Sequence, residues 1–221
     1  MASGSKGNCY ICGAELGKTA MKNHIFKAHG GEDGGQECSL LKIEGAYDKD
    51  YWLFIDLPVD SSLSDVDKFL RKIWLECCGH LSEFSGPGHS KIGKGRKLNA
   101  FSAGDQLLHE YDFGTPTETL ITVVGPIKRK PQRENVRLLA RNVPPQFKCA
   151  ECGSPAEYIC TQCVYDSDNP FYCSACGEKH EHDEMLLPVT NSPRMGECGY
   201  DGELDTFTFV PLGAKDGGGK S

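Results

Sequence analysis

The arrangement of apolar and polar residues is most regular in the middle of the chain. Residues 51–57 are mostly aromatic or branched and stop at Pro58, a pattern typical of a strand. Residues that favour helix N-caps occupy 60–65 and precede apolar side chains spaced three and four apart. This spacing predicts an amphipathic helix that ends near Gly79. Its apolar face consists of Val66, Phe69, Leu70, Ile73, Trp74 and Cys77.

Two further apolar runs, 107–113 and 120–124, are typical of strands. The pattern therefore predicts an α+β fold class for residues 38–126, a small mixed domain with antiparallel strands and one main amphipathic helix. The flanking segments have few apolar positions, so we expect zinc-stabilised small modules there. The predicted segments are a Cys/His unit at 1–31, a basic connector at 127–148, a cysteine-rich module at 149–200 and a disordered tail at 213–221.

Composition excludes several classes of protein. The chain has 221 residues, of which 38% are hydrophobic, too few for one large apolar core. No apolar run approaches the roughly 20 residues of a membrane span, and the first thirty residues lack the features of a secretory signal. We therefore expect a cytoplasmic protein with no membrane partner. In that compartment its twelve cysteines are expected to bind metal and not to form disulfides.

Six cysteines form three Cys-x-x-Cys pairs in the C-terminal part of the chain, and two histidines follow them. These residues are Cys149, Cys152, Cys160, Cys163, Cys173, Cys176, His180 and His182. A two-residue spacer allows a tight turn that points both sulfurs at one ion, and eight such ligands complete two tetrahedral zinc sites. Spacing alone leaves the pairing open. The sites are either sequential, or interleaved with the first and third pairs sharing one ion.

The stretches 171–176, 180–183 and 186–188 resemble the second half of a B-box, and the module resembles B-box and MYND-type cross-brace fingers. The resemblance implies the interleaved arrangement, in which Cys160 and Cys163 share an ion with the histidines. One residue separates these histidines, fewer than B-boxes usually have. Cys198 is therefore an alternative to His182 as the last ligand.

The N-terminus carries another metal-binding signature. Cys9, Cys12, His24 and His29 are spaced almost as in a two-Cys-two-His zinc finger, with a helix over 19–28 carrying both histidines. We therefore expect three zinc ions in the whole chain. Each would be structural, because four protein ligands leave no open position for water.

Charge suggests where a partner would bind. The net charge of −7 does not steer the whole protein to nucleic acid, but the finger and residues 127–148 are basic. Only Asn23, among the base-reading positions of the finger, has a side chain able to hydrogen-bond a base edge. Phosphate contacts are predicted for Lys18, Lys22, Lys27, Lys128, Arg129, Lys130, Arg133, Arg137 and Arg141. The alternative is that 127–148 is a solvated linker.

The middle domain has no complete catalytic set. Cys77 lies on the apolar face of the predicted helix, so we expect a buried thiol there. His80 is placed to cap the carbonyl groups at the end of this helix. The glycine-rich segments of the domain lack the sequence context of a nucleotide-binding loop.

Four stretches of the middle domain resemble the Ri-plasmid open-reading-frame-three-like family: 63–74, 80–84, 104–107 and the Tyr-Asp-Phe-Gly sequence at 111–114. The resemblance implies an α+β fold found in bacterial and archaeal proteins, most of them uncharacterised. The Asp-x-Trp-x-His pattern that follows this sequence in the family is replaced here by 115–119. Residues 191–200 are similar to the tail of a zinc-bearing subgroup of the family.

Together these patterns predict a non-enzymatic zinc-binding adaptor associated with nucleic acid or ribonucleoprotein. The first alternative is a protein–protein interaction scaffold, as B-box and MYND modules often are. The second is an enzyme of unknown chemistry with a site around His109, Tyr111 and Asp112. Salt separates the first two, because binding to nucleic acid weakens steeply as salt increases.

Overall fold

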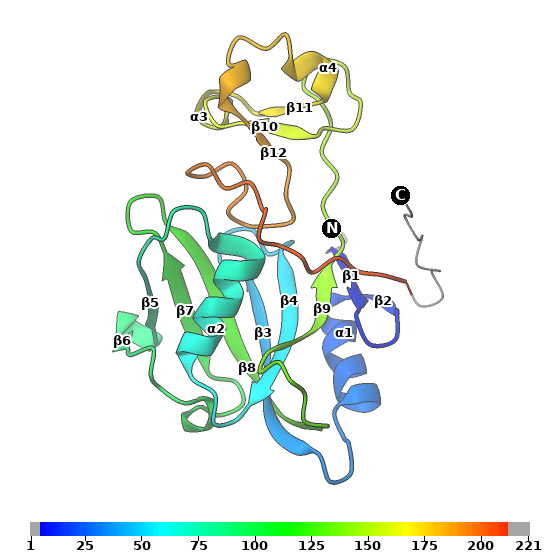
Figure 1. Cartoon of the computed structure of the whole chain (residues 1–221), viewed down its shortest axis with the longest axis vertical. Coiled ribbons are helices and arrows are strands. Elements are labelled where there is room, and N and C mark those ends of the chain that lie inside the picture. The colour runs from blue at the N-terminus through cyan, green and yellow to red at the C-terminus, as the bar shows by residue number, and fades with distance from the viewer. Residues whose placement is uncertain (1–4, 212–221) are drawn as a thin grey trace.

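The computed structural model describes residues 5–211, which form one large and one small sheet (Figure 1). The predicted tail at 213–221 lies outside the described residues. The large sheet has nine strands in the order β2-β1-β9-β4-β3-β8-β7-β5-β6, and each strand is antiparallel to its neighbours. These strands are β1 (Lys6–Cys9), β2 (Glu15–Gly17), β3 (Gln36–Gly45), β4 (Trp52–Pro58), β5 (Ser82–Ser85), β6 (Lys91–Ile92), β7 (Gln106–Tyr111), β8 (Thr117–Arg129) and β9 (Arg137–Asn142).

The helices are short, so the prediction of an α+β domain built on one main amphipathic helix was wrong. The predicted helix does form, as α2 (Leu63–Leu70) and its π-helical continuation η2 (Arg71–Leu75), but the nine-stranded sheet dominates the fold. Local periodicity missed this because strand pairing joins segments far apart in sequence. The other helical segments are α1 (Lys18–His24), η1 (Ile25–His29), η3 (Pro87–His89), η4 (Leu98–Ala100), α3 (Cys163–Asp166), α4 (Ser174–Gly177) and η5 (Asp183–Met185).

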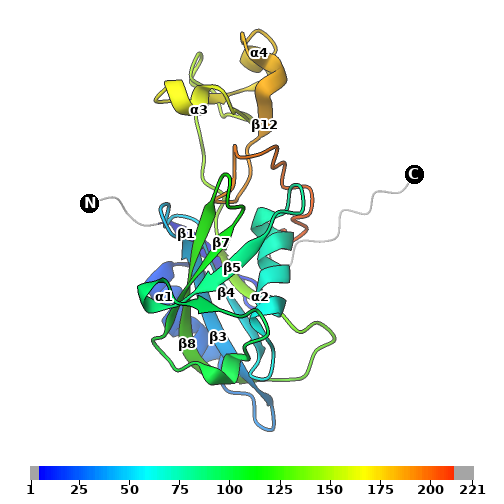
Figure 2. The same cartoon turned by 90° about the vertical axis from the view of Figure 1, so that its left-hand side faces the viewer.

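The middle of the large sheet is covered on both faces. Along β4, Leu53 and Ile55 belong to the cluster beneath α2, whereas Trp52 and Phe54 belong to a second cluster with Met21 of α1. A strand covered on both sides needs apolar residues on both faces, which explains why every residue of β4 is buried and Asp56 is its only charged side chain. Figure 2 shows α1 and α2 on opposite faces of the sheet.

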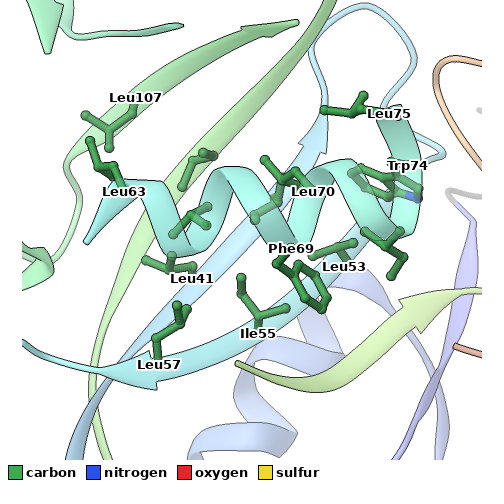
Figure 3. Packing of buried hydrophobic residues seen from close by; sticks show 14 of the residues in the cluster. Leu41, Leu53, Ile55, Leu57, Leu63, Phe69, Leu70, Trp74, Leu75 and Leu107 are labelled. Atoms are coloured by element: carbon green, nitrogen blue, oxygen red, sulfur yellow. The ribbon is translucent and has the colours of Figure 1, made fainter. Parts of the chain in front are cut away.

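The sequence fixes the start of α2 and its apolar face. The Asp65 carboxylate accepts hydrogen bonds from the backbone N–H and the hydroxyl of Ser62, at 2.8 and 2.9 Å, a capping interaction that begins the helix. From there Leu63, Phe69 and Leu70 point toward the sheet (Figure 3). The apolar face predicted from the spacing is therefore the face that α2 buries against the sheet.

The N-terminal finger is continuous with the large sheet. Strand β1 pairs with β9, and a Cβ atom at Gly7 would overlap the Arg141 carbonyl group and the Trp52 ring. The segment 127–148, predicted as a connector, contains the end of β8 and all of β9. The finger and this segment thus share one sheet with the middle of the chain.

The C-terminal module has a separate sheet in the order β11-β10-β12 and lies at one end of the molecule (Figure 1). Its strands are β10 (Tyr158–Cys160), β11 (Phe171–Tyr172) and β12 (Leu186–Pro188). Residues 189–211, called the return segment below, then run back along the large sheet. Here the Ser192 hydroxyl donates to the Trp74 carbonyl at 2.6 Å, and Arg141 donates to the Asn191 carbonyl at 2.6 Å.

Within residues 5–211, no helix has the length and apolar character needed to cross a membrane.

Candidate metal centres

The N-terminal group consists of Cys9, Cys12, His24 and His29, and the structure brings all four together. The Cys12 Sγ and His24 Nε2 atoms are 3.1 Å apart, the Cys9 Sγ and His29 Nε2 atoms 3.5 Å, and the two Nε2 atoms 3.2 Å. Zinc bonds of about 2.0–2.3 Å in tetrahedral geometry place ligand atoms about 3.3–3.8 Å apart. These four residues can therefore hold one metal ion.

A glycine shapes the turn between the first two ligands. Gly13 has φ +77° and donates its N–H to the Cys9 carbonyl at 2.9 Å, while the Cys9 N–H donates to the Ala14 carbonyl at 2.8 Å. Residues with a Cβ atom rarely adopt this conformation. The turn therefore depends on a residue that the Cys-x-x-Cys spacing does not include.

In the C-terminal module the first and third pairs lie together, which is the interleaved arrangement. The group is Cys149, Cys152, Cys173 and Cys176, with 3.6 Å between the Sγ atoms of Cys152 and Cys173. The same turn recurs here, since Gly153 has φ +73° and donates its N–H to the Cys149 carbonyl at 3.0 Å. The group has the spacing of a four-thiolate site.

The thiols of this group have very different pKa values. Burial alone would raise the pKa of Cys149, but hydrogen bonds from the backbone N–H groups of Cys152 and Cys173 outweigh burial and lower it to about 6. The neighbouring thiols of Cys152 and Cys173 raise the pKa of Cys176 to about 12. Negative charges crowded together repel, so a cation among the sulfurs would favour deprotonation of this group.

The second pair forms the other group of the module, Cys160 and Cys163 with His180 and His182. The Cys163 Sγ atom lies 3.3 Å from His180 Nε2 and 3.9 Å from His182 Nδ1. The Tyr172 ring stacks on His180 with 4.1 Å between the ring centroids, which fixes the orientation of the imidazole. His182 occupies the place for which Cys198 was the alternative.

A further group was missed by the sequence analysis. Cys77, Cys78, His80 and Cys198 each offer one ligand atom within 4.8 Å of the others. Cys77 was expected to be a buried thiol and His80 a helix cap, and neither expectation foresaw a shared site. The available signal was the Cys-Cys-x-His sequence, but its remaining ligand lies 118 residues beyond His80, outside any motif spacing.

Two of the arginines predicted to contact phosphate are buried, and a third, Arg137, is half-buried. Arg129 is 1% exposed and Arg141 is 4% exposed. Arg129 and Arg137 both pair with the buried Asp56 carboxylate, at 2.9 and 2.6 Å, and Arg141 pairs with Asp205 at 2.7 Å. Withdrawing one partner from a buried ion pair is costly, so the structure holds Arg129 and Arg141 in contacts inside the protein. Sequence composition could not distinguish them from solvated cations.

The other basic residues divide into paired and exposed. Lys18 of α1 pairs with Glu44 of β3 at 2.5 Å. Five are exposed, and we call them the exposed basic set: Lys22, Lys27, Lys128, Lys130 and Arg133. The Lys128 N–H donates to the Gly30 carbonyl at 3.0 Å, so the basic end of β8 lies directly beside the end of the finger helix.

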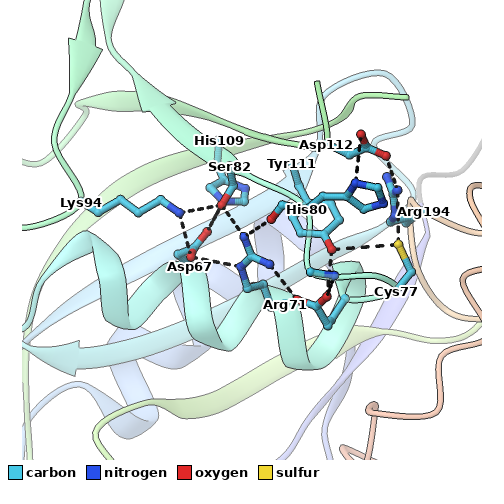
Figure 4. Close-up of polar contacts among 12 residues, drawn as sticks. Asp67, Arg71, Cys77, His80, Ser82, Lys94, His109, Tyr111, Asp112 and Arg194 are labelled. Atoms are coloured by element: carbon cyan, nitrogen blue, oxygen red, sulfur yellow. Dashed lines mark hydrogen bonds and ion pairs between the residues drawn. The ribbon is translucent and has the colours of Figure 1, made fainter. Parts of the chain in front are cut away.

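The polar side chains of the middle domain form a network around Asp67 (Figure 4). This carboxylate lies 2.9 Å from His109 Nε2 and accepts hydrogen bonds from Ser82 at 2.6 Å and Lys94 at 3.0 Å. Burial raises the pKa of Asp67, but the hydrogen bonds from His109, Ser82 and Lys94 outweigh it and lower the pKa overall. Burial lowers the pKa of His109. These contacts join α2 to β5 and β7, and the enzyme alternative stays a prediction.

The fold and these groups define a class, a sheet-based protein whose Cys/His groups can hold metal ions. No protein-family model and no curated protein matches the chain. A solved structure of a protein of unknown function, MM3350 from Methanosarcina mazei Go1, is 18% identical, covers 54% of this chain and 76% of its own, and has a TM-score of 0.42. The resemblance to the Ri-plasmid open-reading-frame-three-like family stays a prediction.

Proposed function

We propose that the protein is a non-enzymatic adaptor held together by structural zinc ions. The observation that supports this is the spacing of the ligand atoms in the N-terminal group and in the two C-terminal groups. Thiolate and imidazole ligands suit zinc, and four protein ligands leave no position for a substrate. Because the thiols must stay reduced to bind metal, we place the protein in the cytoplasm.

Bound zinc would supply a crosslink between the chain segments that carry its ligands. Three groups would each hold one ion. They are the N-terminal group with Cys9, the group of four cysteines with Cys149, and the group in which Cys160 and Cys163 lie with His180 and His182. Elemental analysis of the reduced, purified chain is expected to find at least three zinc ions per chain. Replacing Cys12 by serine should remove one ion per chain, whereas replacing Cys38, which lies outside every group, should remove none. If the purified, reduced protein contains no zinc, the proposal is wrong.

The partner we propose is nucleic acid, contacted through its phosphates. The support is the exposed basic set: Lys22 and Lys27 are exposed on the finger helix, and the end of that helix, at Gly30, contacts the backbone of Lys128. Lysine contacts to phosphate carry no sequence information, so we expect binding that is weakly selective and strongly dependent on salt.

Binding to nucleic acid can be tested with two double variants that change the net charge by the same amount. Lys22→Glu/Lys27→Glu should weaken binding to a mixed-sequence single-stranded RNA or duplex DNA about tenfold or more, measured by fluorescence anisotropy at low salt. Lys68→Glu/Lys91→Glu changes exposed lysines elsewhere on the sheet domain and should leave the affinity nearly unchanged. Equal losses in both variants would indicate only a general charge effect.

A protein partner is the second candidate, favoured by a different surface. On the C-terminal module, Tyr165 is 72% exposed and Met185 is 42% exposed. Aromatic and methionine side chains are enriched in protein interfaces. Absence of nucleic-acid binding, together with a salt-tolerant complex that Tyr165→Ala weakens, would favour the scaffold over the nucleic-acid adaptor.

A further inference from the structure

The turn after η2 and the return segment bring four unassigned ligand residues to one place. The His80 Nε2 atom lies 3.3 Å from Cys198 Sγ, and the Cys78 and Cys198 Sγ atoms are 3.9 Å apart. The first separation matches an edge of a tetrahedral zinc site, about 3.3–3.8 Å, and the second is slightly longer than such an edge. They are far longer than a disulfide bond of about 2.05 Å, so the thiols are free. Cys77 supplies the remaining sulfur.

The imidazole in this group has the support that metal-binding histidines usually have. Its other ring nitrogen, Nδ1, faces the Asp112 carboxylate at 3.4 Å, and Arg194 donates to the second oxygen of that carboxylate at 2.7 Å (Figure 4). A histidine that ligates metal nearly always presents its second nitrogen to a carboxylate, a carbonyl or water. Here the carboxylate leaves Nε2 of His80 directed at the sulfurs.

The turn that carries Cys77, Cys78 and His80 is held by its own contacts. The Glu76 carboxylate accepts hydrogen bonds from the Gly79 N–H and from Arg71, the latter at 2.7 Å, and Arg71 also donates to the His80 carbonyl at 2.6 Å. Gly79 has φ +75°. The three ligands on this side are therefore preorganised by the domain itself.

The fourth ligand arrives on a strained backbone. Cys198 has φ +46°, a conformation unusual for a residue with a side chain, and it lies between Gly196 at φ +83° and Gly199 at φ +70°. Such strain persists where the surroundings determine the conformation, and it concentrates at functional sites. In this case the conformation presents the Cys198 sulfur to the turn.

We propose that Cys77, Cys78, His80 and Cys198 bind a further zinc ion that fastens the return segment to the large sheet. Three thiolates and one imidazole fill its coordination, and the thiol protons pass to solvent as the metal binds. The site shares no ligand with the other three groups. Because the return segment leads directly out of β12, this ion also limits how far the C-terminal module can move away from the sheet.

The site differs from the other groups in exposure. Cys78 and Cys198 are both exposed, whereas every other Cys/His group contains at least one buried cysteine. A chelator therefore reaches this ion first. In a titration with a chelator, one zinc per chain should leave before the rest.

Zinc content tests the site directly. Cys198→Ser in the full, reduced chain should contain one zinc fewer than the unchanged protein, and Cys12→Ser/Cys198→Ser should contain two fewer. Cys38→Ser and His89→Ala, which lie outside all groups, should keep the full number. If Cys198→Ser keeps the full number while Cys12→Ser loses one ion, this inference is wrong and the proposed structural zinc stands. A Cys78–Cys198 disulfide in protein purified with reductant would also overturn it.

Proteolysis tests the fastening role and does not depend on metal analysis. Arg194 lies in the return segment and is fully buried, so trypsin cuts after it only when the segment leaves the sheet. Cleavage after Arg194 should be about tenfold faster or more in Cys198→Ser, with His89→Ala unchanged. An unchanged rate in Cys198→Ser would show that the ion does not hold the segment.

Discussion

The N-terminal finger and the C-terminal module use the same metal-binding turn in different surroundings. In both, a Cys-x-x-Cys pair is followed by a glycine with positive φ, Gly13 or Gly153, whose N–H returns to the first cysteine. The finger then packs on the large sheet, where Met21 is fully buried beside Trp52. Neither apolar cluster of the described residues includes a residue from 149–188.

This difference shows how much a bound zinc ion would contribute to the stability of the finger and of the C-terminal module. The finger has two supports, apolar burial against β4 and the four ligands. The C-terminal module has a small interior, so its fold depends mainly on its ligands, as in other domains too small to fold alone. Identical turns therefore predict different responses to the loss of zinc.

The largest expected effect follows removal of zinc with a chelator. Residues 149–188 should unfold, because apparent zinc-binding free energies of about 10–16 kcal/mol exceed what so small a core provides. The large sheet should remain folded. Residue-resolved NMR spectra with and without chelator measure this, and loss of signals from β3, β4 and β8 at the same chelator concentration would contradict the comparison.

Two double cysteine variants distinguish the interleaved from the sequential pairing of the ligands in the C-terminal module. Cys149→Ser/Cys173→Ser removes two ligands of one group and should cost one zinc ion, whereas Cys149→Ser/Cys160→Ser removes one ligand from each group and should cost two. Zinc content of both proteins, measured in excess zinc, gives the answer. The reverse result would favour the sequential pairing.

An intermediate effect is expected from the core of the finger. Met21→Ala should lower the free energy of unfolding of the large sheet by about 2–5 kcal/mol, since the side chain is completely buried between α1 and β4. The neighbouring Lys22→Ala, on the exposed side of the helix, should change it by less than about 0.5 kcal/mol. Urea denaturation followed through tryptophan fluorescence compares them. A finger that folds independently would leave the transition of the sheet unmoved in both.

The smallest expected effect is a difference in zinc affinity between Gly13→Ala in the finger and Gly153→Ala in the C-terminal module. An alanine at positive φ costs roughly 1–2 kcal/mol. In the module, that strain exists only in the zinc-bound fold, so Gly153→Ala should weaken zinc binding about tenfold. In the finger, the sheet holds the turn with or without zinc, so Gly13→Ala should leave the zinc affinity nearly unchanged. Competition with a zinc-binding dye measures both affinities, and equal weakening would remove the distinction between the two regions.

Residue spacing predicted the local parts of this molecule well. The α2 face and the membership of the N-terminal group follow from contacts within some twenty residues, where chain geometry limits the choices. The nine-stranded sheet could not be predicted in the same way, because β4 is buried on both faces and β9 lies within a basic segment. In the sequence, the arginines of this segment resemble solvated charges. The structure shows that Arg129 and Arg137 instead pair with Asp56, which is far away in sequence.

By itself, the sequence determined which cysteines and histidines can share an ion when a short turn or one helix joins them. Only the tertiary structure decided that Cys198 meets the turn at Cys77, that the finger is an edge of the large sheet, and that Arg129 is internal. The reason is physical. A short spacer restricts the distance between two side chains, whereas over a hundred residues of chain restrict almost nothing until strand pairing and burial bring the ends together.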